Sequence, residues 1–130
     1  MKKIIPVLLI TTLCLSAGIA FADGKPITGN DWIKVDKKAH VQLVTDFIRQ
    51  AKKEGVTISK GPVFYCQKLD KLYERKPNML KEPVWKVLKT SIIMEYDWKQ
   101  KGVDQDKLAK EWLGEKLYNK NKERRARIKQ

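Results

Sequence analysis

The chain has 130 residues, of which 28 are Lys or Arg and 15 are Asp or Glu, giving a formal net charge of +13 at pH 7. This length suits one domain with a modest core, and the excess of positive charge favours anionic partners. With one histidine and two cysteines, the sequence lacks the ligand pairs of common zinc and haem sites, so we expect no metal and no cofactor.

The first 22 residues have the pattern of a cleavable secretory signal peptide. Lys2 and Lys3 precede an uncharged apolar stretch, and Ala20 and Ala22 place small residues at the positions that signal peptidase reads. Cleavage near Ala22 predicts a mature protein of the periplasm or the cell exterior. A transmembrane anchor and a lipoprotein attached through Cys14 are the alternatives.

The mature chain is predicted to be all-α: a four-helix single domain over residues 23–119. Residues 23–35 form an irregular lead-in, and we expect its Trp32 to dock on the core. The first helix is the clearest, because apolar residues recur at helical spacing between an N-cap at Asp36 and Gly55 at the C′ position.

Proline and glycine bound the other three predicted helices. The second has Pro62 in its first turn and ends before Pro77. The third opens at Pro83 and is broken at Gly102, and the fourth follows an N-cap at Asp104. The apolar face of the fourth helix continues to Leu117.

Two features of the helical region remain open at this level. Residues 56–58 have the composition of a short strand, but the sequence shows no evident partner strand. Cys66 is the single cysteine after cleavage, which excludes an intrachain disulfide. We expect it to be a buried small hydrophobe, with a reactive thiol or an intermolecular bridge as the alternatives.

Residues 120–130 form a basic extension, helical or disordered, with a lone acidic residue. We expect it to bind an acidic partner: an envelope polymer, an anionic lipid at a membrane surface, or a protein. Nucleic acid is less available outside the cytoplasm. Trp98 and Tyr118, near helix ends, are candidate aromatic contacts for the same partner. The predicted anion-binding residues are Lys120, Lys122, Arg124, Arg125, Arg127 and Lys129.

The search for catalytic residues finds only weak arrangements. Cys66 and His40 lie on successive predicted helices and form the one conceivable nucleophile and base. Asp70 and Glu74 share a helix face, but the interleaved Lys71 makes solvated ion pairs the ordinary explanation.

The layout over about residues 28–96 resembles a broad group of small, signal-bearing helical proteins of Gram-negative bacteria. The matching positions are Thr28-Gly29-x-x-Trp32, Lys38, the Val41 to Phe47 run, Leu69-Asp70-x-x-Tyr73, Asn78, Pro83 and Val84. The resemblance implies an exported helical domain with no assigned catalysis. The group overlaps in layout with periplasmic immunity proteins that neutralise peptidoglycan amidase toxins. Those proteins typically carry cysteine pairs, whereas Cys66 stands alone here.

The sequence therefore predicts an exported, non-enzymatic helical binding protein of the bacterial periplasm with an acidic partner. The alternatives are an immunity protein that inhibits a cell-wall-degrading toxin and a small hydrolase that uses Cys66 or carboxylates.

Overall fold

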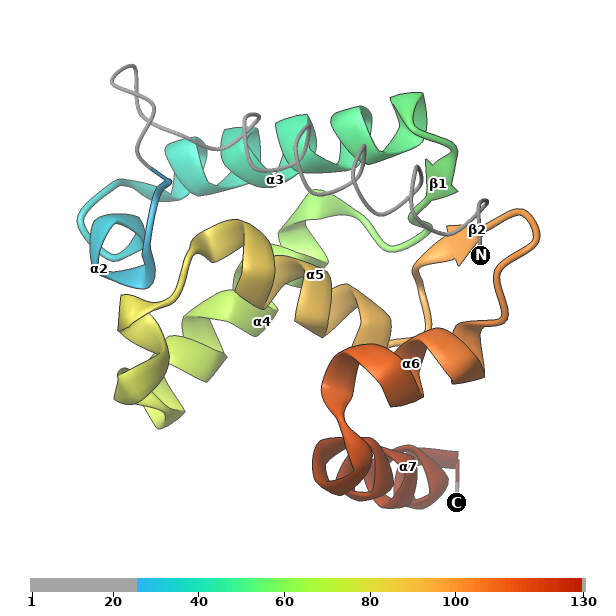
Figure 1. Ribbon diagram of the computed structural model, residues 1–130. Coiled ribbons are helices and arrows are strands. Elements are labelled where there is room, and N and C mark those ends of the chain that lie inside the picture. The colour runs from blue at the N-terminus through green and yellow to red at the C-terminus, as the bar shows by residue number, and fades with distance from the viewer. Residues whose placement is uncertain (1–25, 130) are drawn as a thin grey trace.

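The computed structural model describes residues 26–129, which form six α-helices, one 3-10 helix and a two-stranded antiparallel sheet (Figure 1). The elements are α2 (Gly29–Trp32), α3 (Lys37–Lys53), β1 (Val56–Thr57), α4 (Pro62–Arg75), η1 (Pro77–Lys81), α5 (Val84–Met94), β2 (Lys99–Gln100), α6 (Gln105–Leu113) and α7 (Glu115–Lys129). Helix α3 lies along one side of the molecule, with α4 and α5 beneath it and α6 and α7 at the carboxyl end (Figure 1).

The mostly helical fold is confirmed, but the predicted count of four helices is wrong for the described residues. A short additional helix, α2, lies within the expected irregular lead-in, and Trp32 at its end is fully buried, as expected. The second additional helix is α7. It is separate from α6 because Gly114, at a φ of 81°, ends the preceding helix three residues before Leu117.

Helix α3 has the boundaries that its sequence predicts. The Asp36 carboxylate accepts a hydrogen bond of 2.8 Å from the backbone N–H of Ala39, which caps the helix. Gly55 has a φ of 87°, the left-handed conformation that favours glycine after a helix end. Both signals are local, so the sequence alone sufficed to find them.

The short run at residues 56–58, which the sequence left open as a strand without an evident partner, contains strand β1 and has a partner. Strand β1 pairs with β2 in an antiparallel ladder, with Val56 opposite Gln100 and Thr57 opposite Lys99. The partner segment consists of two polar residues without a strand pattern, so no local signal predicts it.

Helix α5 ends at Met94, well before the predicted break at Gly102. The backbone N–H of Tyr96 bonds to the Ile93 carbonyl and that of Asp97 to the Ile92 carbonyl. This is a Schellman ending, in which Tyr96, at a φ of 55°, takes the position usually held by glycine. The turn sends the chain back toward the core at Asp97.

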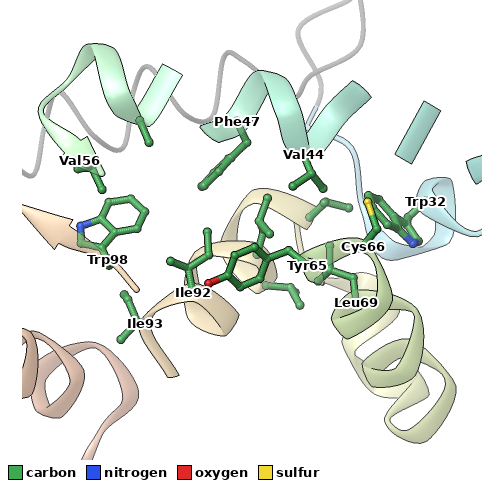
Figure 2. Packing of buried hydrophobic residues seen from close by; sticks show 14 of the residues in the cluster. Trp32, Val44, Phe47, Val56, Tyr65, Cys66, Leu69, Ile92, Ile93 and Trp98 are labelled. Carbon is green, nitrogen blue, oxygen red and sulfur yellow. The ribbon is translucent and has the colours of Figure 1, made fainter. Parts of the chain in front are cut away.

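The hydrophobic core lies between α3, α4 and α5 (Figure 2). Val44 and Phe47 project from α3 toward Tyr65 of α4, and all three side chains are fully buried. Cys66 is 7% exposed, as its interpretation as a small core residue requires.

A buried carboxylate fastens the segment after β1 to the segment after α5. Asp97 is 3% exposed and accepts hydrogen bonds from the backbone N–H groups of Ser59 and Lys60, both at 2.9 Å. It also accepts a bond of 2.8 Å from the Tyr65 hydroxyl. Burial, followed by the contact with Asp97, raises the pKa of Tyr65 above its ordinary range.

Gly29 is expected to be the most sensitive glycine, because a Cβ there would lie 2.6 Å from Tyr73 Cε1 and 2.8 Å from Leu80 Cα. Gly29→Ala should lower the free energy of unfolding by about 1–3 kcal/mol through overpacking, as measured by urea denaturation. The matched control is Gly61→Ala, because a Cβ at Gly61 would have no neighbour within 4 Å. Gly61 is the N-cap of α4, and replacing an N-cap residue with alanine costs about 1 kcal/mol. The control should therefore lower the free energy of unfolding by no more than about 1 kcal/mol. Equal losses in the two variants would contradict the steric argument.

The predicted signal peptide, residues 1–22 with Cys14, lies outside the described residues. Among the helices of residues 26–129, none combines the length and the apolar character that crossing a membrane requires.

Candidate functional site

The predicted basic extension is part of helix α7. This helix begins at Glu115 and continues to Lys129, so it crosses the expected boundary at residue 120 without interruption. Its basic side chains divide between two sides of the helix. Three of the six expected anion-binding residues line a groove on the protein surface: Lys120, Arg124 and Arg127.

Lys122 and Arg125, two other basic residues of α7, do not line this groove. Lys122 lies 5.9 Å from the centre of the Tyr118 ring, and Arg125 lies 4.4 Å from the centre of the Tyr96 ring. Cation–π contacts of this kind fix part of the positive charge against the protein itself. Lys129 is the last residue of the helix.

The groove has a volume of about 520 Å³ and lies between α4, α5 and α7; Figure 1 shows the elements that surround it. Both apolar and basic side chains line the groove, and we call the apolar lining residues its floor and the basic lining residues its walls. The floor residues are Leu72, Met79, Val87, Met94 and Leu117. The basic residues are Lys68, Arg75, Lys76, Lys120, Arg124 and Arg127. We call this feature the basic groove.

Half of the basic side chains in the groove were not expected as site residues. Lys68 and Arg75 come from α4, and Lys76 directly follows that helix. Lys68 and Arg75 are seven residues apart, so they share a helix face, and this spacing was a signal that the sequence offered. The sequence did not predict that these residues share a groove with residues of α7, because no local signal links two helices so distant in the chain.

Among residues 26–129, Glu95 is the one acidic side chain that lines the basic groove. Its Oε2 atom lies 2.8 Å from Lys68 Nζ and 3.3 Å from an Arg124 guanidinium nitrogen. Burial alone would raise the pKa of Glu95, but the hydrogen bond from Lys68 and the charges of Lys68 and Arg124 outweigh it and lower that pKa. One carboxylate thus bridges cations from both walls.

Asn121 anchors α7 beside the end of α5. It is 2% exposed, and its Nδ2 donates a hydrogen bond of 3.1 Å to the Met94 carbonyl. That carbonyl belongs to the last turn of α5, where the helix leaves acceptors without an internal partner. The Asn121 Oδ1 accepts bonds from Arg124 at 3.2 and 3.0 Å. The basic extension is therefore docked by specific contacts.

A second cavity, of about 360 Å³, adjoins the basic groove. The two share four lining residues: Met79, Val87, Thr90 and Leu117. Beyond these, the second cavity is lined by Trp112 and Leu113 and, at its polar side, by the Glu82 and Lys86 pair. The shared residues place the two cavities next to each other, and we call the pair the trough; basic residues line the groove, and mostly apolar residues line the second cavity.

The two aromatic residues expected at the surface lie in the core. Trp98 is 2% exposed and packs near Phe47, with 6.5 Å between ring centres. Tyr118 is 4% exposed, and its hydroxyl donates to the Asp106 carboxylate. Neither side chain offers a face to a partner, because the turn after α5 carries Trp98 inward and the α6–α7 pairing covers Tyr118.

Lys89 is a buried cation between two tryptophans. It is 3% exposed, and its Nζ lies 4.8 Å from the centre of the Trp98 ring and 4.3 Å from that of Trp112. Burial lowers the pKa of Lys89 to about 8, and the nearby Glu54 carboxylate acts in the opposite direction. The indole nitrogen of Trp112 donates to Thr90 Oγ1 at 2.8 Å, which holds one side of this cage in place.

The residues considered for nucleophilic chemistry are held in structural roles. His40 stacks on Trp32, with 3.8 Å between ring centres, and its Nε2 donates to the Trp32 carbonyl. Burial, with a contribution from the Asp70 charge, raises the pKa of Cys66 to about 11, which keeps the thiol protonated at neutral pH. Asp70 in turn accepts a hydrogen bond of 2.8 Å from the Trp32 indole.

Within residues 26–129, no group of three or more His, Cys, Asp or Glu side chains is arranged to hold a metal ion. Comparison of the chain with protein-family models, with curated proteins and with solved structures finds no match. The basic groove is the candidate site on the strength of its own geometry and charge.

Proposed function

We propose that the mature protein is an exported, non-enzymatic binding protein that engages an anionic partner through the basic groove. One observation carries the proposal: six basic side chains, from α4, from the residue that follows it and from the distant α7, line one concave surface that, among the described residues, contains a single, already paired carboxylate. The signal-peptide pattern of residues 1–22 supports export. The protonated state of Cys66 and the structural role of Asp70 favour binding over hydrolysis.

Four of the groove cations are available to a partner. Within the described residues, Arg75, Lys76, Lys120 and Arg127 have no ion pair, whereas Lys68 and Arg124 both contact Glu95. A basic residue near an anionic surface contributes about 1 kcal/mol of binding energy at low to moderate salt. The free cations therefore supply enough attraction for selective capture of an anion, with an affinity that falls as salt screens the charges.

Neutralising two groove cations should weaken the binding of a polyanion much more than neutralising two cations elsewhere. The test variant is Arg75→Gln with Lys120→Gln, and the control is Lys107→Gln with Lys122→Gln, which removes the same charge from residues outside the groove. With dextran sulfate as the probe, we expect the dissociation constant to rise about tenfold in the test variant and about twofold in the control at moderate salt. Equal weakening would show that the charge acts diffusely and would contradict the proposed site.

Deleting the basic extension would be a less informative experiment. Asn121 and Arg124 lie in that segment and bond to the Met94 carbonyl and the Glu95 carboxylate. Truncation would remove these contacts along with the charge, so a loss of binding would have two explanations. Point substitutions of exposed groove residues avoid this ambiguity.

A further inference from the structure

We propose that the basic groove and its adjoining cavity hold one free single-chain anionic amphiphile, an alkyl chain that carries a phosphate or carboxylate head group. This inference rests on the proposed function and specifies the chemical class of its partner. It follows from three observations: cations from α4 and α7 meet at Glu95, apolar residues are shared by the two cavities, and both cavities are concave.

Cations of α4 and α7 lie close enough at Glu95 for one small anion to reach both helices. Lys68 of α4 and Arg124 of α7 contact the same oxygen atom of Glu95, at 2.8 and 3.3 Å. A single carboxylate therefore already bridges the two helices. A phosphate or carboxylate head group of similar size would find Arg75, Lys120 and Arg127, lining cations that Glu95 does not pair, available in the same groove.

Apolar side chains are shared by the two cavities of the trough. Met79, Val87 and Leu117 line both the groove of about 520 Å³ and the neighbouring cavity of about 360 Å³, so an alkyl chain that covers them would lie against both. Trp112 and Leu113 also line the neighbouring cavity. Both volumes fall in the range of about 300–1,000 Å³ that is typical of small-molecule sites. A soluble polyanion would use the cations and leave this apolar floor exposed to water.

The shape favours a free molecule over the surface of a bilayer. The apolar residues of the trough line concave cavities, and the hydrocarbon region of a flat membrane does not enter such cavities. Insertion into a membrane uses exposed apolar residues that project outward. The most exposed large apolar side chains in the described residues lie outside both cavities: Ile33, Val35, Val63 and Ile128.

Charge also argues against a second copy of the chain as the occupant. The mature chain carries 26 basic and 15 acidic residues, and the rim of the groove is basic. Two such surfaces repel each other. An anionic amphiphile satisfies the cations at one end and covers the apolar floor with the same molecule.

The test is isothermal titration calorimetry of the full mature protein with dodecyl phosphate below its critical micelle concentration. Hexyl phosphate, inorganic phosphate and the neutral dodecyl maltoside are the comparison ligands. Because each buried methylene strengthens binding about fourfold, dodecyl phosphate should bind far more tightly than hexyl phosphate. Inorganic phosphate and dodecyl maltoside should each bind at least about a hundredfold more weakly than dodecyl phosphate.

Variants of apolar and of basic lining residues separate the roles of charge and apolar surface. Dodecyl phosphate should bind more tightly than hexyl phosphate, and Leu117→Gln should reduce this gain in affinity about tenfold, because Leu117 lines both cavities. Arg75→Gln with Lys120→Gln should weaken the binding of both alkyl phosphates by a similar factor. The gain in affinity from hexyl to dodecyl phosphate should remain unchanged in this variant. Dodecyl phosphate should also change the tryptophan emission, and Trp112→Phe should remove most of that change. Circular dichroism and thermal melting verify that each variant is folded.

Each result decides the inference. Tight binding of dodecyl phosphate that depends on both chain length and charge supports it. If dextran sulfate binds in the groove but dodecyl phosphate binds no better than inorganic phosphate, the amphiphile is wrong and the proposed anion site stands. If the protein binds anionic vesicles and ignores monomeric dodecyl phosphate, a membrane surface replaces the free molecule. If neither polyanion nor alkyl phosphate binds, the proposed function fails together with the inference.

Discussion

Replacing Asp97 with asparagine is expected to lower the free energy of unfolding by about 3–5 kcal/mol, the usual loss when a buried ionic or hydrogen-bonded network is broken. The Asp97 carboxylate accepts three hydrogen bonds, from two backbone N–H groups and the Tyr65 hydroxyl. The asparagine amide has one acceptor oxygen, and its NH₂ group would face a donor. Urea denaturation followed by circular dichroism measures the loss.

The control for this variant is Asp46→Asn. Asp46 also accepts hydrogen bonds, but its side chain is 38% exposed and its ion pair with Arg49 lies on the surface of α3. The control should change the stability by less than about 1 kcal/mol, as exposed ion pairs do. Comparable losses at Asp46 and Asp97 would mean that the buried carboxylate does not fasten the two segments as described.

The second large effect concerns Lys89 and pH. The pKa of Lys89 is about 8 in the folded protein, against an ordinary value of 10.5. Between these two pH values the unfolded chain binds more protons at this site than the folded chain, so stability rises with pH. Because each pH unit in this interval is worth about 1.4 kcal/mol, Lys89 should contribute a gain of about 3 kcal/mol from pH 8 to pH 10.5.

Other groups act in the opposite direction at high pH. Burial raises the pKa of Cys66 to about 11 and raises the pKa of Tyr73 above its ordinary range. As pH rises, both groups ionise in the unfolded chain before they ionise in the folded chain, so they lower the free energy of unfolding. The measurement is therefore the difference in unfolding free energy between the wild type and Lys89→Met across the pH range. These other groups are present in both proteins and cancel in that difference. A difference that does not change with pH would contradict the burial of a charged Lys89 between the tryptophans.

Local signals predicted the parts of this fold that depend on a few neighbouring residues. Asp36 and Gly55 marked the two ends of α3, and Pro62 marked the start of α4. A cap, a left-handed glycine and a first-turn proline each act within one helical turn, so their effect can be read from a short window.

The missed features depend on residues far apart in the chain. Tyr96 takes a left-handed conformation that its residue type disfavours, and its hydroxyl bonds to Asp106 on another element. This turn ends α5 early, carries Trp98 into the core and supplies the partner strand of β1. Helical periodicity continued through the segment, so the pattern gave no reason to end the helix there.

The candidate site was predicted in part, for the same reason. Composition identified the basic residues of α7 but not which side of the helix each would occupy. Lys122 and Arg125 lie against tyrosine rings, whereas Lys120 and Arg127 line the basic groove. The facing wall, contributed by α4, follows from tertiary packing, which a single sequence does not reveal.

The burial of Cys66 has a practical consequence. It is the only free cysteine of the described residues, it is 7% exposed, and its raised pKa keeps it from forming the reactive thiolate. An alkylating reagent should therefore modify it only when the molecule opens. The chain carries its own reporter of transient opening under native conditions, and at reagent concentrations where alkylation outpaces reclosing, the rate of mass gain gives the frequency of that event without any denaturant.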